Sequence, residues 1–260
     1  MRALGVTLFD GEIDNVFSTA ACYLYNYSTG INVLGHVVGA DRTFGDDYRF
    51  GFLWRSSSSV KVFVDFQTIA NGINDKDQVV GQTGGGELEE ASKAVLWDNG
   101  FKTYLDTNVT VVDTEFSPGD SYCSGANGIN DSGQVVGWSN MGMFQCPVFF
   151  FVNPQGVVHA FVWKAPAGMQ DLGTLPGDTV SVARKINLFG QVIGSSGNTL
   201  AWQDGPPEGG GSVTVIGRPF IWSERSGMRD LNTLVRAIQS GCSPQPQTLT
   251  FGAKLWDRAC

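Results

Sequence analysis

Short apolar runs alternate with turn-forming residues along the chain, and one such pattern is written four times. Each copy has two apolar segments around a short connection that starts with Asn and has Gly or Asp near its end. Asn starts turns, and Gly and Asp accept the left-handed backbone conformation, so each copy predicts a β-hairpin. The four stretches are GINVLGHVVG (30–39), GINDKDQVVG (72–81), GINDSGQVVG (128–137) and KINLFGQVIG (185–194).

Two further apolar segments follow the hairpins. The first ends in tryptophan, as FGFLW, KAVLW, HAFVW and RPFIW, at Trp54, Trp97, Trp163 and Trp222. The second occurs as MQDLGTL (169–175) and MRDLNTL (228–234), with FKTYLDT (101–107) as a degenerate version. Aromatic and β-branched residues between Gly, Asp, Asn and Pro clusters are typical of strands. One unit therefore reads as four antiparallel strands.

The spacing of the units predicts their architecture. The anchor residues Ile31, Ile73, Ile129 and Ile186 lie 42, 56 and 57 residues apart, which is about the size of a propeller blade. We expect an all-β fold, a β-propeller of about four to five four-stranded antiparallel units, with an open β-repeat stack as the alternative. Closure is favoured because it protects strand edges and because the caps that a linear stack needs are not evident.

The repeats bound the domain organisation. Recognisable units cover about 3–235, a diverged tail follows over 236–260, and 1–260 is expected to form a single repeat domain. The tail segment Leu255, Trp256 and Asp257 is interpreted as a decayed Ile-Asn box, so that the chain would stop inside a fifth unit.

Composition narrows the classes of partner. The 34 glycines and the 16% of charged residues favour many tight turns over solvated helices. The net charge of -8 argues against a nucleic-acid partner. The sequence contains no run of 18 apolar residues, so no membrane-spanning helix is predicted. The first residues make a poor signal peptide, so the chain is either cytosolic or has lost its signal.

The five cysteines suggest disulfides and no metal site, because none falls in a C-x-x-C or Cys/His ligand pattern. Cys123 and Cys146 flank the third hairpin and could approach each other, while Cys242 and Cys260 lie in the tail. In an oxidising compartment these would form two disulfides and leave Cys22 over. Five unpaired thiols are the alternative. No cofactor and no metal ion are predicted.

These ordered boxes resemble the HAF repeats of a family known as probable extracellular repeat proteins. Its units read roughly Ala-x-x-Ile-Asn-x-x-Gly-Gln-Val-Val-Gly, then His-Ala-Phe-x-Trp, then Asp-Leu-Gly-Thr-Leu. The likeness is close in ANGINDSGQVVG, HAFVW and MQDLGTL, and covers most of 3–235. Asp77 departs from the pattern in place of Gly, and His36 in place of Gln. The resemblance implies an extracellular or cell-surface location, and it supplies no activity or catalytic residue.

Residues that recur in every unit are expected to shape the fold. The recurring asparagines, Asn32, Asn74, Asn130 and Asn187, are predicted to bond the backbone of their own turns. A ring of amides that binds a ligand is the alternative. The recurring tryptophans, Trp54, Trp97, Trp163 and Trp222, are predicted to pack between neighbouring units. An exposed platform for stacking sugars is the alternative.

The acidic and imidazole side chains give no catalytic pattern. His36 aligns with Gln in the other units, and His159 aligns with Phe50, Lys93 and Arg218, so neither histidine supports a catalytic triad or a metal site. Asp171 and Asp230 recur, and are expected to cap a neighbouring turn. Asp75 and Asp77 could touch calcium, but the remaining oxygen ligands are not evident nearby.

These observations favour a non-catalytic extracellular or cell-surface repeat protein that acts in binding or assembly. Its partner would be a protein or glycan surface, including other copies of the chain, and the variable loops 82–92, 106–122, 138–158 and 195–216 would make the contact. A carbohydrate-binding propeller is the first alternative, with Trp138 and Trp202 as candidate ligand-binding residues. A propeller-type polysaccharide hydrolase or lyase is the second, although no acid–base constellation supports an enzyme.

Overall fold

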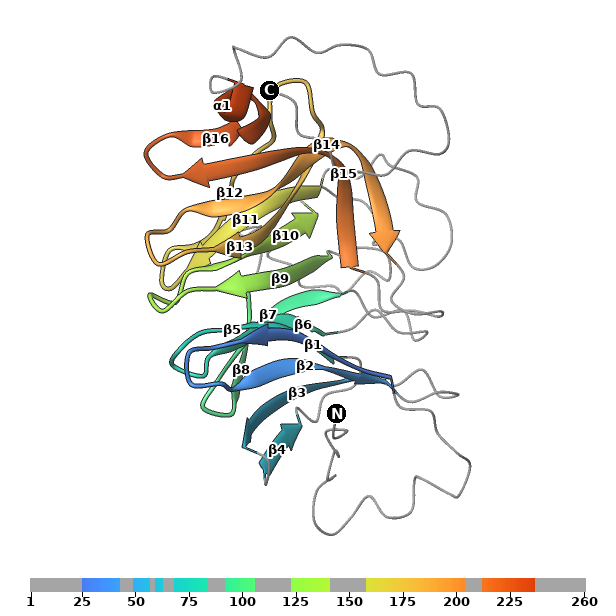
Figure 1. The fold of residues 1–260 in the computed structure, drawn as a ribbon, viewed down its shortest axis with the longest axis vertical. Helices are drawn as coiled ribbons and strands as arrows, with labels where there is room; N and C mark the ends of the chain where they lie inside the picture. The colour runs from blue at the N-terminus through green and yellow to red at the C-terminus, as the bar shows by residue number, and fades with distance from the viewer. Residues whose placement is uncertain are drawn as a thin grey trace, which may run out of the picture.

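The computed structural model describes residues 25–42, 49–56, 59–62, 68–83, 92–105, 123–140, 158–203 and 212–236. Within these ranges the protein is all-β, with four four-stranded antiparallel sheets and one short helix (Figure 1). In each sheet the strands lie side by side in the order of the chain. We call the sheets units 1 to 4. The prediction of repeated four-stranded antiparallel units is confirmed.

Each unit takes four consecutive strands. Unit 1 consists of β1 (Tyr25–Ile31), β2 (Val37–Arg42), β3 (Arg49–Ser56) and β4 (Ser59–Val62). Unit 2 consists of β5 (Thr68–Ile73), β6 (Val79–Thr83), β7 (Lys93–Asp98) and β8 (Phe101–Tyr104). Unit 3 consists of β9 (Ser124–Ile129), β10 (Val135–Asn140), β11 (Val158–Lys164) and β12 (Gly168–Asp171). Unit 4 consists of β13 (Val180–Ile186), β14 (Val192–Gln203), β15 (Ser212–Ser223) and β16 (Gly227–Asp230), followed by α1 (Leu231–Arg236).

The repeated boxes occupy equivalent places in the four sheets. In unit 3, Ile129 pairs with Val135, and Val135 pairs with Trp163 on its other side. The same Ile–Val–Trp row crosses units 1, 2 and 4. The four Ile-Asn boxes are therefore hairpins in one common register, as predicted.

The hairpin turns have the backbone conformation that their sequence predicts. The fourth turn position has positive φ in every unit: 74° at Gly35, 60° at Asp77, 76° at Gly133 and 74° at Gly190. Left-handed backbone costs little for Gly and is tolerated by Asp, which explains the residue types at this position.

A β-bulge in the first strand explains another recurring glycine. In each unit one residue of the first strand is left out of the pairing with the second strand. This bulged residue is Thr29, Asn71, Asn127 or Arg184 in units 1 to 4. Opposite the bulge lies the Gly of the Val-Val-Gly box. In unit 3 a Cβ on Gly137 would overlap the carbonyl oxygen of Gly125, and the same holds at this position in the other units. Only Gly fits there.

The apolar core lies between successive units. One cluster joins Val38 and Leu53 of unit 1 to Val79 and Trp97 of unit 2. A second cluster links units 2 and 3, and two more link units 3 and 4. The first strand of each later unit lies against the first three strands of the unit before it. Each unit therefore buries its faces on its neighbours in the chain.

The described units do not close into a ring. Figure 1 shows units 1 and 4 at opposite ends of the long axis, and no strand of one is in extensive contact with a strand of the other. The arrangement is propeller-like but open, with four units, so the expectation of closure is corrected. The exposure of Ile193 on unit 4 is consistent with this open arrangement. Ile193 is 46% exposed, whereas its counterparts Val38, Val80 and Val136 in the other units are fully buried.

Three local features differ from the sequence prediction. Strand β4 completes unit 1 although no Asp-Leu box marks it. Strands β14 and β15 are each 12 residues long and pair well into 195–216, which was predicted as a loop. The alternation in SVTVI favours strand over loop there, and the paired arm is visible in Figure 1. After Asp230 the chain forms α1, whereas MQDLGTL in unit 3 turns at Gly173, where φ is 68°.

Candidate binding surface

The hairpin turns of the four units lie along one side of the molecule and are organised by their asparagines (Figure 1). The Oδ1 atom of each Asn accepts hydrogen bonds from two N–H groups of its own turn. In unit 3, Asn130 Oδ1 accepts from the N–H of Ser132 at 3.2 Å and of Gln134 at 3.0 Å. Units 1, 2 and 4 repeat both bonds. This is the role in the turn that the sequence predicts.

The other amide atom of the asparagine joins one unit to the next. Asn32 Nδ2 donates to the carbonyl oxygen of Asn74 at 3.1 Å, and Asn74 Nδ2 donates to that of Asn130 at 3.0 Å. Asn130 Nδ2 continues the row to the carbonyl of Asn187 at 2.9 Å. The amides in this row bind protein backbone, so the alternative of a free ligand-binding ring is wrong for Asn32, Asn74 and Asn130.

Aspartates at the second turn position add a parallel row of bonds. Asp75 Oδ1 accepts from the N–H of Val33 at 3.0 Å, and Asp131 Oδ1 accepts from the N–H of Asp75 at 2.8 Å. These carboxylates therefore connect units. In the part of the chain that the structure describes, no group of three or more His, Cys, Asp or Glu side chains is placed to hold a metal ion.

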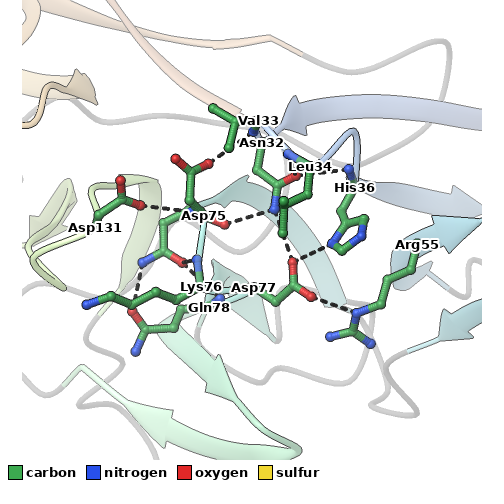
Figure 2. Close-up of polar contacts among 11 residues, drawn as sticks. Asn32, Val33, Leu34, His36, Arg55, Asp75, Lys76, Asp77, Gln78 and Asp131 are labelled. Carbon is green, nitrogen blue, oxygen red and sulfur yellow. Dashed lines mark hydrogen bonds and ion pairs between the residues drawn. The ribbon is translucent and has the colours of Figure 1, made fainter.

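A charged cluster distinguishes the junction of units 1 and 2 from the others (Figure 2). His36 Nδ1 lies 2.7 Å from Asp77 Oδ1, and Arg55 Nε donates to Asp77 Oδ2 at 2.7 Å. Asn32 Nδ2 also donates to Asp77 Oδ1, at 3.0 Å. The two departures from the repeat pattern, His36 and Asp77, are therefore partners in one contact.

The electrostatics of the cluster follow from this geometry. Partial burial alone would raise the pKa of Asp77, but the hydrogen bonds and charges of His36 and Arg55 outweigh it and hold the pKa below its ordinary value of 3.8. Asp77 is thus a carboxylate that three side chains of unit 1 hold in place. Because both carboxylate oxygens of Asp77 in unit 2 contact side chains of unit 1, the cluster holds one unit against the other.

The recurring Asp-Leu aspartates cap turns, as predicted. Asp171 Oδ1 accepts from the N–H of Gly173 at 2.7 Å, and Asp230 Oδ1 accepts from that of Asn232 at 2.8 Å. Each also contacts a basic side chain on the neighbouring strand: His159 Nδ1 lies 2.8 Å from Asp171 Oδ2, and Arg218 Nη1 lies 3.1 Å from Asp230 Oδ2. His159 therefore takes the place that Arg218 has in unit 4.

The tryptophans differ from their predicted roles in one respect. Trp97 and Trp222 are buried in the core clusters, and Trp163 packs against one of them while half-buried. Trp138, a candidate for stacking sugars, is only 2% exposed, because it lies in the cluster between units 3 and 4. That assignment is wrong. Trp202 lies in β14, paired with Val213, and its side chain is outside the described residues.

Most of the predicted binding loops also lie outside the described residues, including 84–91, 106–122, 141–157 and 204–211. The described part of 195–216 is the paired arm. Leu200 and Val215 on this arm pack on the cluster that contains Cys123 and Trp138 of unit 3. The arm is thus anchored to the neighbouring unit.

Exposed apolar turn tips are a feature that the sequence interpretation missed. Val33 and Leu34 of unit 1 are 80% and 61% exposed, and Leu188 and Phe189 of unit 4 are 68% and 87% exposed. The corresponding tips of the middle units are polar, with Asp75-Lys76 and Asp131-Ser132. The signal was present in the aligned repeats, because apolar tips occur only in the first and the last copy.

No family model, no curated protein and no solved structure matches this chain. The resemblance to HAF repeats stays a prediction. Among the described helices, none is long and apolar enough to cross a membrane. Cys123 is disulfide-bonded, and its predicted partner Cys146 lies outside the described residues.

Proposed function

We propose that the chain is a non-catalytic, extracellular or cell-surface repeat protein that acts in binding or assembly. The observation that carries the proposal is the use of the recurring polar groups. The asparagine, Asp75 and Asp131 side chains bond turns and neighbouring units, and both histidines pair with carboxylates. These groups build a scaffold, so specificity belongs to the surfaces on which the units differ.

The disulfide at Cys123 supports an oxidising location, because disulfides persist outside the reducing cytosol. The proposal predicts that Cys123, which is buried, resists alkylation even when the unreduced protein is unfolded, and reacts once the unfolded protein is also reduced. Mass spectrometry of the alkylated peptides measures this directly, and Cys242 and Cys260 can be followed in the same digest. A freely alkylated Cys123 would count against the proposed location.

Glycan binding and polysaccharide turnover test the proposal against its two alternatives. The intact chain is screened on a glycan array, together with Trp202→Ala and with Trp163→Ala as a control for general damage to the fold. Sugar binding that Trp202→Ala alone removes would favour a carbohydrate-binding protein. Turnover of a polysaccharide that is abolished by changing one acidic residue would favour the hydrolase or lyase and overturn the proposal.

A further inference from the structure

The two ends of the row of units leave two faces uncovered by described residues. Each junction joins a trailing face, which looks toward the next unit, to a leading face, which looks back toward the previous one. Three junctions of this kind connect the four units. The leading face of unit 1 and the trailing face of unit 4 are the two corresponding faces at the ends of the row, and neither contacts a further unit among the described residues.

Side chains of the core type are exposed on both of these faces. On the trailing face of unit 4, Ile193 is 46% exposed, and in units 1 to 3 this position is fully buried. On the leading face of unit 1, Ile31 is 68% exposed and Val37 is half-buried, whereas Ile129 and Val135 of unit 3 are 8% and 0% exposed. Both faces therefore carry apolar surface that an ordinary junction would bury.

The turn tips of the two ends are matched in polarity. Neighbouring tips touch within the chain, because the N–H of Val33 bonds Asp75 and the N–H of Asp75 bonds Asp131. At a junction of unit 4 with unit 1, Leu188 and Phe189 would come beside Val33 and Leu34. This contact would bury four side chains that are 61–87% exposed.

The hydrogen-bonding groups of the two faces are also complementary. The carbonyl oxygens of Asn74, Asn130 and Asn187 each accept a bond from the preceding unit's Asn Nδ2. Among the described residues, the Asn32 carbonyl accepts only from Gly35 within its own turn, and Asn187 Nδ2 donates only to Gln191. Unit 4 thus offers the donor, and unit 1 the acceptor, of the bond that joins every internal pair.

We infer that the trailing face of unit 4 binds the leading face of unit 1 of a second copy, so that copies join head to tail. The inference rests on the proposed role in assembly and continues a junction that the chain already makes three times. A head-to-tail contact uses two different surfaces, and so each bound copy still presents one free face of each kind unless the copies close a ring.

Two cations make this junction looser than the internal ones. Arg184 and Lys185 stand where unit 3 has Asn127 and Gly128, and Arg184 Nη2 donates to Thr214 in its own sheet instead of to a following unit. A Cβ on Gly30, Gly72 or Gly128 would lie only 3.2–3.5 Å from the backbone of the next unit. Lys185 adds a long side chain at this close approach, which weakens the contact and keeps it reversible.

Sedimentation velocity of the intact protein, from micromolar to submillimolar concentration, tests the inference. The wild-type chain is expected to associate as its concentration rises. Ile193→Asp alters the trailing face and Ile31→Asp the leading face, so each variant alone should be monomeric. An equimolar mixture should form dimers and nothing larger, because only one intact face of each kind remains in each pair.

Two further variants make the result specific. Phe101→Asp changes an apolar residue of unit 2 that is 78% exposed and away from both faces, so it should associate like the wild type. Lys185→Gly restores the glycine of the internal junctions and is expected to lower the dissociation constant about tenfold. Circular dichroism and thermal melts confirm that each variant is folded before its mass is interpreted.

The outcomes separate this inference from the proposed function. A wild-type chain that stays monomeric overturns the inference, as does association that survives both Ile31→Asp and Ile193→Asp. Loss through Ile193→Asp alone would indicate pairing of two trailing faces and would also overturn it. These failures would leave the proposed function standing, because that proposal is tested by glycan binding and by turnover.

Discussion

The junction of units 1 and 2 and the junction of units 2 and 3 use the same backbone contacts with different side chains around them. The Asn–Asn bond is 3.1 Å long in the first and 3.0 Å in the second, and an aspartate accepts from a turn N–H in both. The left-handed turn position is Asp77 in the first and Gly133 in the second.

The charge after the recurring tryptophan explains this difference. Arg55 follows Trp54 and pairs with Asp77 across the first junction. Asp98 follows Trp97 in unit 2 and accepts from Gln78 Nε2 of the same unit at 2.9 Å. Position 133 corresponds to Asp77, and Asp98 corresponds to Arg55, so we expect that a carboxylate at position 133 would face the like charge of Asp98 and that Gly133 avoids this repulsion. The common hydrogen bonds therefore build the junction, and paired side-chain changes adapt it.

The largest effect is expected from filling the close approach between first strands. A Cβ on Gly72 would lie 3.2 Å from Gly128 Cα and 3.3 Å from the Asn127 carbonyl, so Gly72→Val should destabilise the fold by about 3 kcal/mol. Gly30→Val should cost less, because its nearest backbone atom in the next unit is 3.5 Å away. Urea denaturation measures both. Equal costs would show that the second junction is no tighter than the first.

Removing the charge of Asp77 should weaken only the first junction. Asp77→Asn loses charge-assisted bonds to His36 and Arg55 at a partly exposed site, and we expect a cost of about 1 kcal/mol at neutral pH. Gln78→Glu offers a matched change of charge inside unit 2, where it would face Asp98 and should also destabilise. An Asp77→Asn protein as stable as the wild type would remove the cluster from the account.

The cluster also predicts a pH dependence. The folded-state pKa of Asp77 is below 3.8, so its stabilising contribution is complete above about pH 5 and is lost as the pH falls through the folded-state value. The stability difference between wild type and Asp77→Asn should therefore shrink in acid. Denaturation curves measured in parallel between pH 5 and pH 3 check this, and a difference that grows over this range would contradict it.

The smallest expected effect is the difference in stability between Asp substitutions at two equivalent glycines, Gly133 and Gly190, which would face different charges. Gly133→Asp would place a carboxylate toward Asp98 of unit 2, whereas Gly190→Asp would place one toward Lys164 of unit 3. Both variants replace Gly at a position of positive φ and so carry a similar backbone cost. The difference between their free energies of unfolding therefore measures the effect of the neighbouring charge. We expect Gly133→Asp to be less stable by about 0.5 kcal/mol, a gap that salt reduces. A reversed order would refute the charge rule.

Sequence reasoning reached the hairpins because their chemistry is local. Asn130 and Gly133 organise one turn from within four residues, and the pattern states that directly. It missed the bond between His36 and Asp77, since alignment of the repeats compares each residue with its counterparts and not with its contacts in the next unit. It missed β4, which has no Asp-Leu box, and the burial of Trp138, which depends on unit 4. It also predicted a closed ring wrongly, because closure depends on whether the faces of the first and last units meet, and the sequence of a single repeat does not determine this.

The central claim is that the recurring asparagines join successive units, and one matched pair of variants tests it most directly. Asn→Asp keeps the Oδ1 acceptor for the turn and removes the Nδ2 donor. Asn130 donates to the carbonyl of Asn187, whereas Asn187 has no following unit among the described residues. Chemical denaturation of Asn130→Asp should show a loss of about 2 to 3 kcal/mol, and that of Asn187→Asp less than about 1 kcal/mol. Equal losses would contradict the claim.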